Sequence, residues 1–271
     1  MRIRLLAGII ASLLLFTTVN GAKADAVQDE ISRITNQLAT DYRINIFYDY
    51  KPTATWQLGG TPADATDTSD LATFVSILNE EFRKYPKAFV HNTHLGAIVL
   101  VKDLGVAGTQ RAAVPDYGRQ ILWLDFKRYL QRGDYQRHII HHEFYHMIDF
   151  ELNNNAYWKD PAWMAFNQPA FKYGNGGASA YQKGPINWYE MSHPETGFVN
   201  HYSTTGVEED KSELFATLFV KSEANKLADW SQTDTVLQAK TKYIKAIVAK
   251  LDPSMDETYW QGLQKQSPVP F

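Results

Sequence analysis

Residues 142–146 read His142-Glu143-Phe144-Tyr145-His146, inside a segment whose apolar residues recur at helical spacing. Four residues apart on a helix, His142 and His146 leave the same face about one turn from each other, so both can bind one tetrahedral zinc ion. Glu143 then lies beside the open coordination position, where it can activate a metal-bound water. With 8 histidines in 271 residues, chance predicts roughly 0.01 such patterns, so an exposed polar helix face is the weaker interpretation.

A third protein ligand must come from outside this motif. The extended pattern H-E-x-x-H-x-x-G-x-x-H is absent, because Asp149 stands at its Gly position and Leu152 at its third His position. Residues 202–216 instead predict the start of a helix that is rich in acidic side chains. Glu209 and Glu213 are one turn apart, so one can bind the metal while the other orients a ligand imidazole. Glu209 is the preferred ligand, and the alternatives are Glu213, Glu190, His193, His201 and Asp210.

Other polar residues near these blocks have structural or surface roles in our interpretation. Thr205 and Glu208 have the spacing of a capping box, which would occupy Glu208 at the helix start. His138 precedes the motif by one turn on a similar face and could come near the metal, whereas His141 points elsewhere; we expect both to be solvated. Asp149 either hydrogen-bonds a ligand imidazole or lies on the helix surface.

The two blocks together resemble the gluzincin metallopeptidases, and within them the catalytic domain of anthrax lethal factor and its bacterial relatives. In that domain the zinc helix reads H-E-F-G-H-x-x-D, and residues 142–149 agree except that Tyr145 replaces Gly. There a Tyr precedes the ligand Glu by seven residues and a further Glu follows it by four, which is the spacing of Tyr202, Glu209 and Glu213. The resemblance implies a zinc-dependent peptidase in which Tyr202 is catalytic and donates a hydrogen bond to the oxyanion. The alternative for Tyr202 is packing behind the helix.

The hydrophobic pattern around these blocks predicts an α+β fold. We expect a zincin-like arrangement, with N-terminal helices and a small mixed sheet, a mostly helical C-terminal lobe, and zinc in the cleft between them. The strand predicted over 120–126 either pairs with an extended peptide or lies in the core. The aromatic-rich segment 155–200 suits a cleft wall or a compact loop subdomain. The predicted helices are 27–39, 71–82, 134–152 and 235–251, the strands 43–50, 97–101 and 120–126, and the loops 53–69 and 105–118.

The N-terminus has the pattern of a secretory signal peptide. Arg2 and Arg4 precede an apolar run over residues 5–19 and the sequence Ala22-Lys23-Ala24, which predicts cleavage after a signal peptide of residues 1–24. The run of about 15 residues falls short of the roughly 20 that cross a bilayer, although an uncleaved anchor is the alternative. We therefore expect a secreted, extracellular protein.

The charge and cysteine content of the chain exclude some classes of binding partner. Cleavage would leave one domain of residues 25–271 with about 24 basic and 30 acidic residues, a formal charge of about −6. Nucleic acid and anionic lipid are then unlikely partners. The chain has no cysteine, so it carries neither a disulfide nor a cysteine-linked lipid anchor.

These observations favour a secreted endopeptidase that binds one Zn²⁺ and hydrolyses protein or peptide substrates. A zinc hydrolase of another amide, such as one in a cell wall, is an alternative that would use the same activation. A zinc-containing binding module is a second alternative, although zinc binding alone does not require Glu143.

Overall fold

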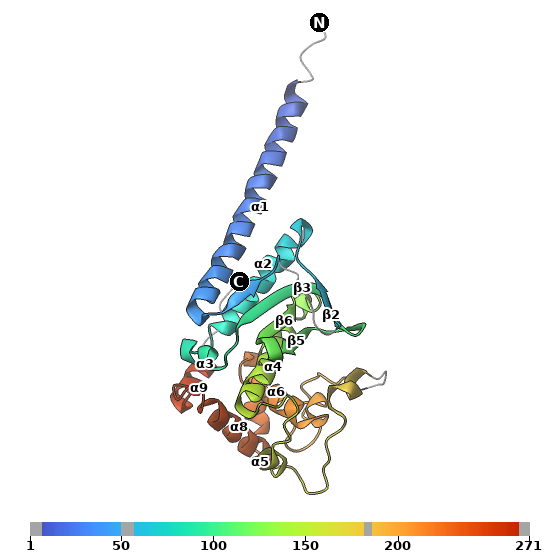
Figure 1. The fold of residues 1–271 in the computed structure, drawn as a ribbon, viewed down its shortest axis with the longest axis vertical. Helices are drawn as coiled ribbons and strands as arrows, with labels where there is room; N and C mark the ends of the chain where they lie inside the picture. Colours follow the sequence, from blue (N-terminus) through green and yellow to red (C-terminus); the bar gives the residue numbers. More distant parts are fainter. Residues whose placement is uncertain (1–6, 50–56, 182–185, 266–271) are drawn as a thin grey trace.

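The computed structural model describes residues 7–49, 57–181 and 186–265, which form an α+β fold (Figure 1). Its helices are α1 (Ala7–Tyr42), α2 (Thr68–Phe82), α3 (Lys87–Asn92), α4 (Asp134–Asn153), α5 (Pro161–Met164), α6 (Val207–Thr217), α7 (Lys221–Trp230), α8 (Thr235–Val248) and α9 (Glu257–Lys265). Its strands are β1 (Asn45–Phe47), β2 (Leu58–Thr61), β3 (Ala97–Val106), β4 (Thr109–Gln110), β5 (Ala113–Asp116) and β6 (Ile121–Asp125). Among the described residues after β6 there are helices and turns but no strand, as expected for a helical C-terminal lobe.

The small mixed sheet is organised around β3. Its main path runs β1-β3-β6-β5, with β1 and β6 parallel to β3 and β5 antiparallel to β6. The second half of β3 pairs antiparallel with β2 and β4. Because side chains alternate along a strand, Ile98 and Leu100 join the main core, whereas Val99 and Val101 join a smaller cluster with Trp123 on the opposite face.

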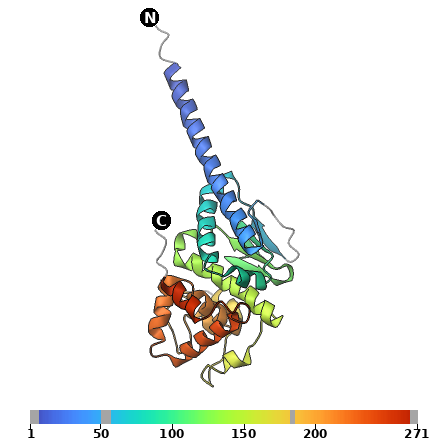
Figure 2. The same ribbon diagram turned by 90° about the vertical axis from the view of Figure 1, so that its left-hand side faces the viewer.

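Helix α4 lies between the sheet and the C-terminal helices. In Figures 1 and 2 the sheet and α2 are on one side of α4, and α6 to α9 are on the other. The helix begins after Gly133, whose φ of 48° suits glycine, and ends at Asn154 in the left-handed conformation. Phe144, Ile140 and Ile148 on α4 are fully buried in the main core. The motif helix is therefore anchored in the core through one face, leaving another face for the chemistry.

The first part of helix α1 extends away from the rest of the molecule, whereas its later turns bury Ile31 and Leu38 in the main core (Figure 1). Residues 7–24 form the first part of α1, and residues 1–6 of the predicted signal peptide lie outside the described residues. Within the described part of the chain, no helix combines the length and the apolar character needed to cross a membrane. Signal cleavage and secretion stay predictions.

Several elements differ from the sequence prediction. The predicted loop 53–69 contains β2, and the predicted loop 105–118 contains β4 and β5. β2 contains two glycines, β4 has only two residues and β5 contains a proline, and the pairing of these segments with β3 and β6 outweighs their weak local propensity. The strand predicted over 120–126 is β6, which is flanked by β3 and β5 and is therefore a core strand. Helix α9 follows the last helix that the sequence predicted and was not itself predicted.

Candidate metal centre

Two packed helices bring the sequence-predicted ligands together. His142 and His146 lie one turn apart on α4, and Glu209 lies in the first turn of α6. Glu209 Oε2 is 3.2 Å from His142 Nε2 and 3.4 Å from His146 Nε2, and the two Nε2 atoms are 3.1 Å apart. The three side chains are nearly or fully buried. These three atoms thus form a compact triangle of metal-ligand types.

The edges of the triangle, 3.1–3.4 Å, are close to those of a tetrahedral metal site. Zinc bonds to nitrogen and oxygen are about 2.0–2.2 Å long, so neighbouring ligand atoms in a tetrahedron are roughly 3.3–3.5 Å apart. Glu209 Oε2 also has no hydrogen-bond partner although it is buried. An unpaired buried carboxylate oxygen is costly, and a bound cation would satisfy it. The donor set is therefore compatible with one metal ion.

In both histidines the nitrogen that points away from the triangle, Nδ1, faces a polar side chain of α6. His142 Nδ1 lies 2.8 Å from Glu213 Oε1, and His146 Nδ1 lies 3.2 Å from the hydroxyl of Ser212. A polar partner at Nδ1, an ion pair at His142 and a hydrogen bond at His146, fixes the ring orientation and leaves Nε2 free to bind a metal. Glu213 thus occupies the place behind a ligand imidazole that the sequence suggested for it.

Tyr202 is held against Glu209 by a short turn. Its hydroxyl donates to Glu209 Oε1 at 3.0 Å, and it belongs to the 3-10 turn Tyr202–Thr204 directly before α6. The side chain of Asn200 accepts from the backbone N–H of Ser203 at 2.9 Å and donates to Glu213 Oε2 at 2.5 Å. Asn200 therefore ties this turn to the carboxylate behind His142, a role that no sequence pattern indicated.

Gly177 approaches this hydroxyl closely from a different part of the chain. A Cβ at Gly177 would lie 2.5 Å from Tyr202 Oη and 3.0 Å from Glu209 Oε1. Any larger residue there would displace Tyr202 or Glu209, so the site requires glycine on steric grounds. No sequence pattern indicated this requirement.

Glu143 lines a cleft together with His142 and Tyr202. Burial raises the pKa of the Glu143 carboxyl, and the neighbouring His142 and His146 partly offset this effect. A carboxyl group whose pKa moves toward neutrality can both take and return a proton. The cleft is also lined by Gln110, Arg111, Ala112, Ala113, Tyr129, Tyr135, His138, Ile139, Tyr189 and Glu213.

The histidines beside the motif are buried, so the expectation that they are solvated is wrong. His138 is 4% exposed and lies between Glu213 and Glu223, and His141 is fully buried beside Glu81 and Tyr85. Burial opposes the charge of His138, but the two carboxylates outweigh it and raise its pKa to about 10. Both side chains escape the usual cost of burial because each has ionic partners.

Other assignments near the site also need correction. The first turn of α6 has Gly206 at its N-cap, and no side chain caps it, so the predicted capping box is not formed. Thr205 instead donates its hydroxyl to the carbonyl of Tyr202. Asp149 forms a buried ion pair with Lys211, linking α4 to α6 without contacting a ligand imidazole. Within the part of the chain that is described, none of the alternative ligands Glu190, His193, His201 and Asp210 joins a metal-binding group.

The aromatic-rich segment 155–200 contributes to the cleft wall and also packs on itself, the two alternatives that the sequence allowed. Tyr189 lines the cleft and packs against Tyr202, with ring centroids 4.9 Å apart. Phe171, Tyr173 and Phe198 instead pack on one another below it. Residues 182–185 of this segment lie outside the described residues.

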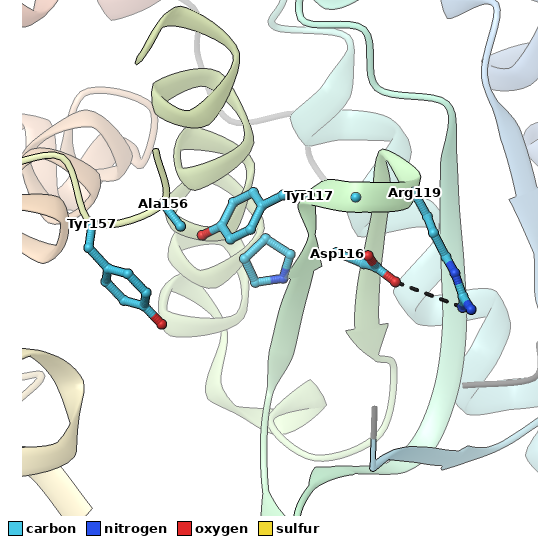
Figure 3. Close-up of a pocket in the computed structure, with 7 residues that line it drawn as sticks. Asp116, Tyr117, Arg119, Ala156 and Tyr157 are labelled. Atoms are coloured by element: carbon cyan, nitrogen blue, oxygen red, sulfur yellow. Dashed lines mark ion pairs between the residues drawn. The ribbon is translucent and has the colours of Figure 1, made fainter. Parts of the chain in front are cut away.

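A second hollow lies at the far end of β5 (Figure 3). It is bordered by Asp116 and Tyr117 on one side and by Tyr157 on the other. Tyr117 stacks on Phe150 of α4 with ring centroids 4.7 Å apart. Among the described strands β5 pairs only with β6, so its other edge runs between this hollow and the cleft.

Comparison with known proteins supports the fold. The chain is similar to a solved structure from Bacteroides caccae that is provisionally assigned as a zinc-binding metallo-peptidase, with a TM-score of 0.53 and 16% sequence identity. The match covers 88% of this chain and 90% of that one, so it extends over nearly the whole architecture. No protein-family model matches the chain, and no curated protein is similar to it. At this identity the likeness concerns the fold, and function must be argued from the site.

Proposed function

We propose that this chain is a secreted zinc-dependent endopeptidase, a gluzincin-type enzyme that uses one Zn²⁺ held by His142, His146 and Glu209. The observation that carries the proposal is the triangle of His142 Nε2, His146 Nε2 and Glu209 Oε2, with edges of 3.1–3.4 Å. Glu143 beside this triangle adds the acid–base group that a purely structural zinc site does not need. The fold likeness to the structure from Bacteroides caccae agrees with this class.

The roles of the protein groups follow from their positions. A bound zinc ion would supply Lewis acidity, lowering the pKa of a coordinated water and polarising a carbonyl. Glu143 takes a proton from the attacking water and returns it to the leaving amine. Tyr202 donates its hydroxyl to the oxyanion, a contribution on the order of 3 kcal/mol for a preorganised donor. Glu213 keeps His142 oriented throughout.

The free edge of β5 suits an extended peptide as substrate. Backbone N–H and C=O groups on an unpaired strand edge can add a further strand, which positions the peptide along the sheet. Residues at the start of β5 line the cleft with Glu143, and residues at its end border the hollow of Figure 3. A peptide bound in this way would pass the catalytic group and reach the second hollow.

The test compares the cleavage of a diverse peptide library by the wild type and by Glu143→Gln, read by mass spectrometry with zinc content measured for each. The matched control is Glu151→Gln, on the same helix but paired with His94 away from the cleft. We expect cuts by the wild type and by Glu151→Gln only. If all three proteins bind zinc and none cuts a peptide, the endopeptidase proposal fails; release of cell-wall fragments would then assign a different amide as substrate.

A further inference from the structure

A chain of buried polar side chains continues from the candidate zinc site to helix α7. His142 Nδ1 contacts Glu213 Oε1 at 2.8 Å, and the other oxygen of Glu213 lies 2.9 Å from His138 Nε2. His138 Nδ1 then lies 2.6 Å from Glu223 Oε2 on α7. His138, Glu213 and Glu223 are each less than a tenth exposed. The four residues come from three helices, so they connect α4, α6 and α7.

The hydrogen-bonding capacity of these groups fixes the direction of the chain. A carboxylate only accepts hydrogen bonds, so an imidazole nitrogen that pairs with either oxygen of Glu213 must carry a proton, as the amide of Asn200 does at Oε2. His138 faces a carboxylate at both of its nitrogens, so it donates at both ends and carries a positive charge. Hydrogen bonds between ions are about twice as strong as neutral ones. The protonated side chain of His138 thus bridges the carboxylates of Glu213 and Glu223.

A second metal site is the competing interpretation of the same atoms. His138, His142 and Glu213 also lie close enough to share an ion. Their ion-pair separations of 2.8 and 2.9 Å are shorter than the roughly 3.3 Å between neighbouring ligand atoms of a tetrahedral zinc ion, and each involves a different oxygen of Glu213. A metal here would also need the Nδ1 of His142, whose Nε2 already belongs to the triangle with Glu209. Ion pairs between protonated imidazoles and the Glu213 carboxylate therefore explain this arrangement without a second metal ion.

We propose that His138 is a positioning residue for the zinc site: anchored by Glu223, it holds Glu213 in the orientation that keeps a proton on His142 Nδ1 and presents His142 Nε2 to the metal. The proposal rests on the proposed zinc site. Partners behind a ligand imidazole typically contribute 10–100-fold to metal affinity or activity. Glu223 extends this support to α7, a helix that contributes no ligand to the triangle.

The experiment measures zinc affinity by competition with a chromogenic chelator, using the full chain and only variants with wild-type circular dichroism. In His138→Gln, one amide cannot donate to both carboxylates, and we expect zinc to bind about 10–100-fold more weakly. Glu223→Gln should also lower zinc affinity, but by less than His138→Gln. The double variant should lose no more zinc affinity than His138→Gln alone, because both residues act through the same chain of contacts. The matched control is His141→Gln, which lies on the same helix, is equally buried and has its own carboxylate partner, Glu81.

Unchanged zinc affinity in folded His138→Gln would overturn the proposal and leave His138 a role in stability only. A stoichiometry of two zinc ions that falls to one in this variant would also overturn it, because His138 would then be a ligand. An equal loss in His141→Gln would do the same, since the effect would not depend on the chain to Glu213. The readout is zinc affinity, so a wild type that binds zinc but cleaves no peptide would refute the proposed function without touching this inference.

Discussion

Two adjacent acidic residues on α6 provide a sharp test of the ligand assignment, because they face different partners. Glu209 points its Oε2 at His142 and His146. Asp210 points the other way and accepts hydrogen bonds from Trp163 Nε1 and the Tyr173 hydroxyl, while Lys240 lies 2.7 Å away. We therefore expect Glu209→Gln to weaken zinc binding and Asp210→Asn to weaken the fold.

The magnitudes follow from these contacts. Zinc binding in four-ligand sites amounts to about 10–16 kcal/mol, so one ligand of four corresponds to roughly 3–4 kcal/mol, or a loss of about 10²–10³-fold in affinity. Removing the charge of Asp210 leaves Lys240 buried without its anionic partner. Breaking a buried pair in this way costs about 3–5 kcal/mol of stability. Glu209→Gln should cost less stability, because it removes a buried charge whose Oε2 has no hydrogen-bond partner.

The assay pairs chelator competition for zinc with urea unfolding of the metal-free proteins. The expected result is a crossed pattern: zinc affinity falls in Glu209→Gln alone, and unfolding shifts to lower urea in Asp210→Asn. Equal zinc affinities in the two variants, once corrected for the folded fraction, would refute the assignment of Glu209 as a ligand. Loss of zinc in Asp210→Asn alone would exchange the two roles.

Three further predictions concern residues around the site. Gly177→Ala should lower kcat more than zinc content, because its Cβ would lie 2.5 Å from the Tyr202 hydroxyl but 3.0 Å from Glu209 Oε1; steady-state kinetics with metal analysis would contradict this if kcat were unchanged. Lys211→Met should lose about 3–5 kcal/mol of stability in urea unfolding, since it leaves Asp149 as an unpaired buried carboxylate, whereas a neutral effect would mean that solvent reaches Asp149. Burial lowers the pKa of His141 to about 4, below the value near 6.5 of the unfolded chain. The neutral imidazole therefore contributes its full stability above about pH 6.5, and this contribution falls as the pH drops toward 4. Urea unfolding measured across this range should show that loss in the wild type and a smaller loss in His141→Gln.

The sequence predicted those parts of the site that depend on local spacing. The four-residue separation of His142 and His146 fixes a shared helix face whatever the surroundings, and the same reasoning linked Glu209 with Glu213. The long helix α4 and the core strand β6 were also predictable, because α4 carries a stripe of apolar residues that ends at three asparagines and β6 is a short continuous apolar run. The general α+β class followed from these elements.

The remainder depends on contacts between segments that are distant in the sequence. His138 was expected to be solvated because a lone histidine usually is, and its burial depends on Glu223, 85 residues further along the chain. Asn200 and Gly177 carry no motif, and their roles come from the way two loops meet α6. β5 was missed because a four-residue strand containing a proline has little local signal, yet it pairs with β6 along its whole length.

The polar contact between α4 and α6 is better explained by metal binding than by stability. His142 faces Glu213 and Asp149 faces Lys211 across this contact, all of them buried. Apolar residues of similar volume would often stabilise such a contact equally well or better, because buried charges must first be desolvated. A ligand that binds only the folded chain reverses this disadvantage, adding about 4 kcal/mol when its concentration is a thousand times its Kd. Buried polar pairs beside the apolar contacts of these helices, such as that of Tyr145 with Phe215, are therefore consistent with the zinc binding that we propose.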